Sequence, residues 1–307
     1  MKKPLLINIT GPTASGKTAM AIALARRLNT EILSADSRQI YQEMRIGTAR
    51  PSEEELRAVP HHFIAEKSVF DPYTAADFER EAMERLTKLF QKYSVVIMAG
   101  GTGLWFKAVN DGLDDIPAVP ENIRRRVVRL WQREGLKALQ KEVALRDPDY
   151  YREADIKNPR RLMRALEIIL HTGKPFSAFR TGQPKSRPFD ALWIGLDMPK
   201  DLLNRRIARR TDGMMEQGLL AEAEALYPHR HLNALQTVGY KELFDYLEGK
   251  IDLNEARRQI IIHTRQYAKR QRTWFRKNPR IQWFDMQNPE KTQEEIYRYV
   301  NQYLHRR

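Results

Sequence analysis

The octapeptide GPTASGKT, residues Gly11–Thr18, is the feature that most constrains the fold of this chain. It fits the phosphate-binding loop pattern G-x-x-x-x-G-K-[ST]. The apolar run Leu5–Ile9 before it has the length of a strand, and the Ala- and Leu-rich segment Ala19–Leu28 after it has helical spacing. A glycine loop between a strand and a helix turns its backbone N–H groups and the positive helix end toward one concavity. We therefore predict a site for polyphosphate oxygens.

Two side chains of this loop have predicted roles of their own. Lys17 is expected to neutralise the outer phosphate, and Thr18 to offer its hydroxyl to Mg²⁺. The full set predicted to bind a diphosphate is Gly11, Pro12, Thr13, Ala14, Ser15, Gly16, Lys17 and Thr18. The loop alone does not identify its ligand, because nucleotides, sulfated nucleotides and prenyl diphosphates present the same anionic oxygens.

The segments around the loop predict an α/β fold with a P-loop NTPase-like parallel sheet. Strand-like runs at 5–9, 31–35 and 95–99 alternate with helical segments, one of them over 75–90. Arginine-dense helical segments follow at 121–134, 136–145 and 159–171, then a Gly-, Pro- and Ser-rich stretch over 173–188. A strand is expected at 191–196, and helices at 201–226, 240–247 and 254–276. We predict a catalytic core of residues 1–112 and 190–307 with a helical C-terminal part, interrupted by an all-α domain at 113–189.

The charge balance indicates a large polyanionic partner. The 307 residues include 53 Lys and Arg against 39 Asp and Glu, a net charge of +14. Nucleic acid is the leading candidate, and the alternative is a soluble surface that is simply rich in basic residues. Without cysteine there are no disulfides or thiolate metal sites. No signal-peptide or membrane-span pattern is present, so we expect a cytoplasmic protein without a membrane partner, acting as a monomer.

One acidic residue is placed to act on a ligand of the loop. The strand at 95–99 ends in Gly100–Gly103, GGTG, where a nucleotide hydrolase normally carries an acid, which argues against an ATPase and predicts a close backbone approach to a ligand. Asp36 instead follows the strand at 31–35. Since the carboxyl ends of parallel strands line the ligand crevice, Asp36 should face the loop. The alternative is a turn or helix cap.

The motifs of the chain, taken together and in order, resemble those of the tRNA dimethylallyltransferases, also called isopentenyl-diphosphate:tRNA transferases, in their bacterial form. They are GPTASGKT, SADSRQIY, RIGTARP, HHF, TAADF, AGGTGLWF, NPRRLMRALEI, RIARRTDGM, VGYKE and TRQYAKRQRTWFR. The resemblance implies transfer of a dimethylallyl group from dimethylallyl diphosphate to N6 of the adenosine directly 3′ of the tRNA anticodon. It also implies that the loop holds the diphosphate of the prenyl donor.

The resemblance implies roles for further residues. Asp36 matches the family's general base, Arg210 an arginine that reaches the diphosphate, and Thr102 a position at the junction of donor and tRNA. Residues matching segments that contact the flipped base or the anticodon stem-loop are Asp36, Ser37, Arg38, Gln39, Arg124, Arg160, Arg161, Leu162, Met163, Arg164, Lys269, Arg270 and Gln271. On the terminal helix, the spacing places Arg258, Arg265, Lys269, Arg272 and Arg276 on one basic face, with Ile260, Tyr267, Gln271 and Trp274 facing more inward.

Three other functions remain open at this point. A small-molecule or nucleotide kinase would use the same loop, with Arg205–Arg210 as a phosphate lid. A prenyltransferase acting on free adenine nucleotides would need no RNA surface, and a non-catalytic RNA-binding protein would leave Lys17 and Asp36 without a role. The neighbours His61 and His62 would point to opposite faces of a strand, so we expect them to be structural rather than a metal site.

Overall fold

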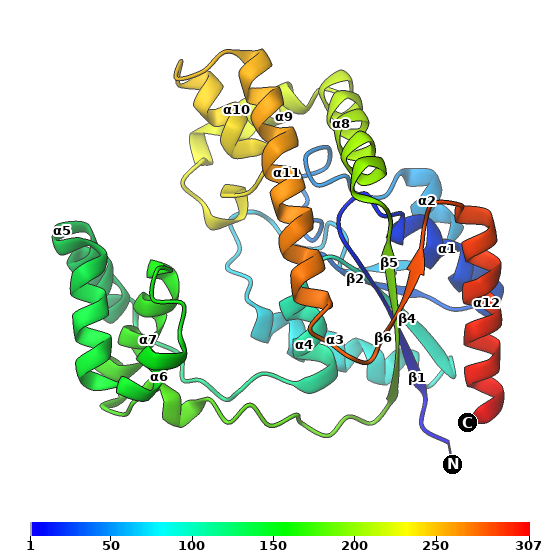
Figure 1. Cartoon of the computed structure of the whole chain (residues 1–307), viewed down its shortest axis with the longest axis horizontal. Coiled ribbons are helices and arrows are strands. Elements are labelled where there is room, and N and C mark those ends of the chain that lie inside the picture. The colour runs from blue at the N-terminus through cyan, green and yellow to red at the C-terminus, as the bar shows by residue number, and fades with distance from the viewer. Residues whose placement is uncertain (1) are drawn as a thin grey trace. The chain divides into compact units, whose positions relative to one another are not determined.

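The computed structural model describes residues 2–307, which form two compact units. The first comprises the chain up to Asn110 together with Arg187–Arg307, and the second comprises Asp111–Ser186. Figure 1 shows a sheet with its covering helices in the first unit and only helices in the second. Within residues 2–307, no helix is both long and apolar enough to cross a membrane.

A six-stranded sheet forms the centre of the first unit. Its strands are β1 (Leu5–Thr10), β2 (Ile32–Ala35), β3 (His61–His62), β4 (Val95–Gly100), β5 (Asp190–Asp197) and β6 (Ile281–Asp285). They lie in the order β3-β2-β4-β1-β5-β6, and every neighbouring pair is parallel. All six strands therefore end at the same edge, and this edge carries the phosphate loop and Asp36.

Helices cover both faces of the sheet. Their bounds are α1 (Lys17–Leu28), α2 (Glu53–Ala58), α3 (Ala75–Leu89), α4 (Gly103–Asp111), α8 (Lys200–Glu216), α9 (Leu219–Leu226), α10 (Tyr240–Leu247), α11 (Leu253–Phe275) and α12 (Pro289–Arg306). Because side chains alternate along a strand, Leu5 and Ile7 of β1 pack with α1 and α12, whereas Leu6 packs with α3 and α4. The predicted parallel α/β fold is confirmed.

The second unit is built from three helices, α5 (Glu121–Arg146), α6 (Pro148–Glu153) and α7 (Pro159–Thr172), and the short 3₁₀ turn Phe176–Phe179. Gly135 has φ 71° and ψ −167°, so it breaks α5 into the two segments that the sequence predicts. The side chain of Asn158 accepts hydrogen bonds from the first turn of α7, and Pro159 occupies its first position. Val127, Leu139 and Leu166 belong to a core of its own.

Two elements near the C-terminus were not predicted from the sequence. After residue 276, β6 joins the sheet beside β5, and α12 packs on the same face as α1. Only the first residue of the five-residue β6 is fully buried, which makes its apolar pattern weak. A short edge strand of this kind is defined by pairing with its neighbour, and pairing cannot be read from local sequence.

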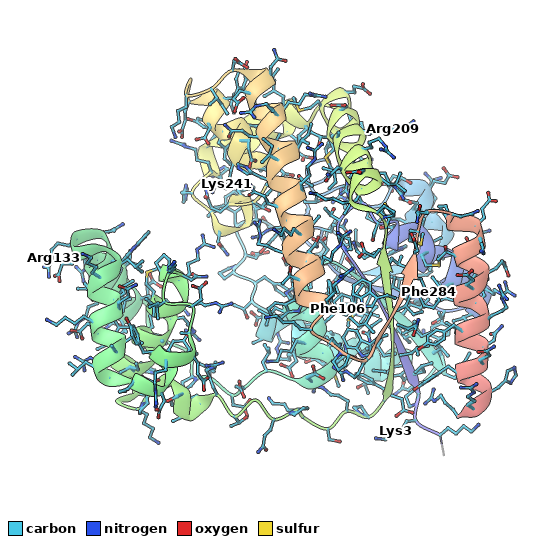
Figure 2. The ribbon with its side chains drawn as sticks, viewed as in Figure 1. Lys3, Phe106, Arg133, Arg209, Lys241 and Phe284 are labelled. Carbon is cyan, nitrogen blue, oxygen red and sulfur yellow. The ribbon has the colours of Figure 1, made fainter. Side chains whose placement is uncertain are left out.

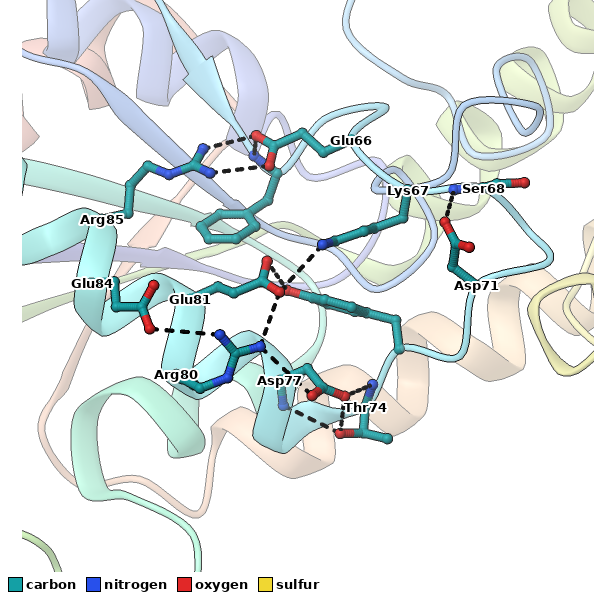
Figure 3. A network of polar contacts seen from close by, with 12 residues as sticks. Glu66, Lys67, Ser68, Asp71, Thr74, Asp77, Arg80, Glu81, Glu84 and Arg85 are labelled. Atoms are coloured by element: carbon teal, nitrogen blue, oxygen red, sulfur yellow. Dashed lines mark hydrogen bonds and ion pairs between the residues drawn. The ribbon is translucent and has the colours of Figure 1, made fainter.

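Ion pairs anchor the segment between β3 and α3, as Figure 3 shows. Arg85 of α3 holds both carboxylate oxygens of Glu66 at 2.9 and 3.3 Å, and Lys67 pairs with Glu81 at 3.2 Å. The side chain of Thr74 caps α3 in a capping box with Asp77. These contacts hold in place the segment that contains Ile64, a residue of the site described below.

Candidate active site

The phosphate loop follows β1 and runs into α1, as the sequence predicts. Gly11 has no room for a side chain, since a Cβ there would lie 2.3 Å from the carbonyl oxygen of Leu196. Gly16 precedes α1 with a φ of 96°, in the region that favours glycine. The ammonium of Lys17 donates a hydrogen bond to the carbonyl oxygen of Pro12 at 2.7 Å. This bond links the end of the loop to its beginning.

Lys17 is electrostatically poised to change its charge near neutral pH. Burial lowers its pKa from 10.5 to about 7, Asp36 opposes this shift, and Arg210 adds to it. Burial also lowers the pKa of Arg210, again opposed by Asp36. Two cations and one carboxylate thus share a partly buried region, and an anion that entered it would favour the charged form of Lys17.

Two arginines of α8 approach the loop. Arg206 and Arg210, four residues apart on one helix face, line the same cavity as Lys17. Arg210 Nη1 donates to the hydroxyl of Thr13 at 3.1 Å, which joins α8 to the loop. Arg209 is exposed and points away from the sheet (Figure 2). Only part of the arginine run in α8 therefore faces the loop.

The loop opens onto a cavity of about 340 Å³. Its polar wall contains Lys17, Thr18, Asp36 and Arg210, and its apolar wall contains Ile32, Ala49, Pro51 and Ile64. A phosphate-binding end beside an apolar wall suits an amphipathic donor that carries a diphosphate and a short hydrocarbon chain. His61 also borders this cavity.

A second cavity of about 250 Å³ adjoins the first. Among the residues that line it are Ser37, Arg38, Gly47, Thr48, Thr237, Gly239 and Tyr267. Four residues border both cavities, namely Thr13, Ala14, Asp36 and Arg210. Asp36 therefore stands where a molecule in one cavity would meet a molecule in the other.

Asp36 is held by its own turn. Its Oδ1 accepts hydrogen bonds from the backbone N–H of Arg38 at 3.0 Å and of Gln39 at 3.4 Å. The turn-cap role considered from the sequence is thus real, and it coexists with a position on the cavity wall. Thr102 accepts a hydrogen bond from the backbone N–H of Ser37 at 3.0 Å, so it supports this turn and lines neither of the two cavities.

The glycines of the turn Gly100–Gly103 differ in what they approach. Gly100 lines the first cavity, whereas Gly101 and Gly103 make room for protein rather than for a ligand. A Cβ on Gly101 would lie 2.2 Å from Nε2 of Gln271, and one on Gly103 would lie 2.1 Å from the indole nitrogen of Trp274. At Gly101 and Gly103 the close approach is therefore made by α11, and the approach to a ligand stays a prediction for Gly100.

The terminal helix also departs from the predicted arrangement. Arg272 and Arg276 pair with Asp197 at 2.5 and 3.3 Å. Arg258 pairs with Glu255 at 2.6 Å, so three of the five cations of the predicted basic face are engaged within the protein. Of the four residues predicted to face inward, Tyr267 and Trp274 are exposed, while Ile260 and Gln271 are buried. Lys269 and Arg270 are exposed.

The buried Gln271 uses both ends of its amide inside the protein. Its Oε1 accepts from the backbone N–H of Thr13 at 2.8 Å, and its Nε2 donates to the carbonyl oxygen of Gly101 at 2.9 Å. The predicted contact of this side chain with tRNA is at odds with these bonds. Gln271 instead joins the phosphate loop to the turn after β4.

The predicted RNA-binding residues of the second unit fall into two groups. Arg124, Arg160 and Arg161 are exposed, and Arg164 is partly exposed and 3.5 Å from Glu167. Leu162 is fully buried and Met163 packs against the same core. The contact of this segment with RNA stays a prediction, and the Leu162 side chain would take no direct part in it, since α7 turns this residue inward.

Several residues of the site had no predicted role in the transferase. Arg206, which was considered only for the phosphate lid of a kinase, lines the first cavity. Tyr267 and the segment 47–51 also line the cavities, and Glu222 of α9 binds the N–H group of Gly47 in that segment. The only signal for the segment was the motif RIGTARP, to which no function was attached. Glu222 follows no recognisable pattern, because its partners lie far away in sequence.

Comparisons with known proteins agree with this geometry. A model of the IPP transferase family matches residues 39–278. The tRNA dimethylallyltransferase of Christiangramia forsetii is 49% identical over 295 residues, which cover 96% of this chain and 97% of the relative. The tRNA isopentenylpyrophosphate transferase structure from Bacillus halodurans has a TM-score of 0.74 at 38% identity, covering 99% of this chain and 98% of that one.

A eukaryotic dimethylallyltransferase described as acting on tRNA is also similar, with a TM-score of 0.84 and 26% identity over 99% of this chain and 80% of that chain. The likeness extends through both compact units and includes the P-loop NTPase-like sheet. These relatives are prenyltransferases, so a kinase is not favoured. The chain belongs to the IPP transferase family, as do the tRNA dimethylallyltransferases that it resembles.

Proposed function

We propose that this protein transfers a dimethylallyl group from dimethylallyl diphosphate to N6 of the adenosine directly 3′ of the anticodon in tRNA, releasing diphosphate. The observation that carries the proposal is the position of Asp36 between two adjoining cavities, one of which ends at the phosphate loop. The relatives named above support the prenyl donor and the tRNA acceptor.

The first cavity would hold the donor. In the reaction, the bond between C1 of the prenyl group and the diphosphate oxygen breaks, and its electron pair leaves with the diphosphate. Lys17 and Arg210 line this cavity and would face the region where this negative charge grows, and fixed donors of this kind stabilise a charged transition state. Diphosphate binding would draw a proton onto Lys17, because its pKa in the free protein is about 7.

Magnesium fits this site as an ion held mainly by the substrate. Thr18 lies on the cavity wall directly after Lys17, and residues 2–307 contain no cluster of three His, Asp or Glu side chains arranged to hold a metal. Mg²⁺ commonly keeps several waters and binds substrate phosphates with one or two protein oxygens. Thr18 would supply a protein oxygen, and the bound ion would neutralise charge on the diphosphate.

The second cavity would receive the adenine. The base must leave its stack to reach a donor held at the loop, as in other enzymes that modify bases. As the bond between N6 and C1 forms, the proton of N6 passes to Asp36, which we assign as the general base. Arg38 and Ser37, which line this cavity, would contact the flipped base or its neighbours.

The exposed cations would position the RNA. We assign Arg124, Arg160, Arg161 and Arg164 of the second unit to the anticodon stem-loop, together with Lys269 and Arg270 of α11. Arginine and lysine contacts of this type bind phosphates and set the register of the RNA. We also propose that the protein acts as a monomer.

Transfer of labelled dimethylallyl diphosphate tests the proposal. The purified protein with Mg²⁺ is given an anticodon stem-loop with adenosine at the target position, the same stem-loop with guanosine there, AMP, or ATP. Label on the adenosine stem-loop alone is expected. Label on AMP or ATP would indicate a prenyltransferase of free nucleotides, and ATP turnover without prenyl transfer would indicate a kinase.

A further inference from the structure

Glu222 of α9 binds the backbone of a distant loop, the segment 45–51. Its carboxylate accepts hydrogen bonds from three consecutive N–H groups at distances between 2.8 and 3.1 Å, those of Arg45, Ile46 and Gly47. Three successive N–H groups that converge on one anion form a strong, directional site. Tyr240 Oη donates to the same carboxylate at 2.6 Å. Glu222 therefore receives four donors.

The opposite side of the segment is held by Gln39. Its Nε2 donates to the carbonyl oxygens of Thr48 and Ala49 at 3.2 and 3.1 Å. Gln39 lies three residues after Asp36 and in the same turn. The segment 45–51 is thus hydrogen-bonded both to α9 and to the turn that carries Asp36, the proposed base.

The segment 45–51 forms a wall of both cavities. Gly47 and Thr48 line the cavity assigned to the adenine, whereas Ala49 and Pro51 line the cavity assigned to the donor. Glu222 itself lines neither cavity, so any effect of this residue on the substrates must pass through the wall.

We infer that Glu222 is a positioning residue that fixes the 45–51 wall and thereby aligns the donor carbon with the adenine N6 at Asp36. This inference rests on the proposed function. Alignment is sensitive to small displacements, since a shift of about 1 Å can lower a rate by about 10²-fold. Three consecutive N–H groups of the wall bind one carboxylate on α9, so the helix holds this end of the wall in place.

The substitution Glu222→Gln keeps the shape of the side chain and removes one of its two acceptor oxygens. A glutamine presents one carbonyl oxygen and an NH₂ group, so some of the N–H groups of residues 45–47 would face a donor instead of an acceptor. Glu224, which is exposed two residues further along α9, provides the matched control Glu224→Gln. Both changes remove one negative charge from the same helix.

We expect two effects of Glu222→Gln that Glu224→Gln does not share. Hydrogen–deuterium exchange in peptides covering residues 45–47 should accelerate about tenfold or more, because those amides lose their acceptor. The ratio kcat/KM should fall about tenfold or more for both the prenyl donor and the stem-loop. Tyr240→Phe, which removes one of the four donors, should give a smaller change in the same direction.

Each outcome separates this inference from the proposed function. Absence of transfer by the wild-type protein would contradict the proposed function itself. If the wild type is active, unchanged kinetic constants in Glu222→Gln would overturn the inference, whether or not exchange accelerates. A lower thermal midpoint with normal kinetics at the assay temperature would likewise reduce Glu222 to a stabilising role. If Glu222→Gln does not fold, the same measurements are made on Tyr240→Phe, and unchanged kinetic constants in that variant would overturn the inference.

Discussion

Asp36 combines a local and a chemical role. One of its carboxylate oxygens caps its own turn through the N–H groups of Arg38 and Gln39, and the side chain also borders both cavities. The sequence predicted each role as an alternative to the other. Because a carboxylate has two oxygens with several lone pairs, one side chain can serve both roles.

Two substitutions at Asp36 separate the roles. Asp36→Asn keeps an oxygen for the turn and loses the basic carboxylate, whereas Asp36→Ala loses both. We expect Asp36→Asn to lower the single-turnover rate of prenyl transfer by about 10²-fold or more, with the affinity for the stem-loop changed only a few-fold. Full activity in Asp36→Asn would show that Asp36 is not the general base. A loss of activity seen only in Asp36→Ala would show that Asp36 serves only to stabilise its turn.

Lys17 gives the reaction a dependence on pH. Its pKa of about 7 means that the free protein carries the charge below this pH and loses it above. We expect kcat/KM for the donor to fall as pH rises from 7 to 9, approaching a tenfold loss per unit. Lys17→Arg, which stays charged throughout this range, should flatten the profile even if its activity is lower. Parallel profiles in the two proteins would assign the titration to the diphosphate or another group.

At the scale of elements, local signals predicted the structure where one segment decides it alone. The glycine loop, the proline and asparagine at the start of α7 and the break at Gly135 all follow from residues that are neighbours in sequence. The environment of the basic face of α11 does not follow from neighbouring residues in the sequence. Helical spacing placed Arg272 and Arg276 on a free basic stripe, but Asp197 at the end of β5 engages both.

Helix α7 presents the clearest contrast between binding and packing. Removing the exposed pair, Arg160→Ala with Arg161→Ala, should weaken stem-loop binding about tenfold, which corresponds to about 1.4 kcal/mol, and reduce the salt slope by about 2. The matched control is Arg80→Ala with Arg27→Ala, because these two arginines pair with Glu84 and Glu294 and belong to no predicted RNA-binding segment. Equal losses in both double variants would attribute the effect to net charge.

Across the whole molecule, composition predicted more about the partner than about the architecture. The net charge of +14 and the arginine-dense insertion indicated nucleic acid and a second unit. The position of β6 at the sheet edge and the grip of Glu222 on the 45–51 segment depend on residues more than 80 positions apart in sequence. No local pattern encodes such contacts, so they could not be predicted from one sequence.

The basic surface also predicts a strong dependence on salt. Each lysine or arginine that binds a phosphate releases counterions, so the logarithm of affinity should fall linearly with the logarithm of salt concentration. We expect a slope of about −0.7 to −0.9 for each phosphate contacted, measured with the stem-loop between 50 and 200 mM salt. A flat response would contradict binding through the exposed arginines.

The most direct test of the central claim is to locate the product. The adenosine stem-loop is incubated with unlabelled dimethylallyl diphosphate, Mg²⁺ and the protein, then digested with nuclease and examined by tandem mass spectrometry. We predict one added dimethylallyl group, on N6 of the adenosine directly 3′ of the anticodon, and none when Asp36→Asn is used for the same short time. A prenyl group on another nucleotide, or an unmodified stem-loop with the wild-type protein, would contradict the account.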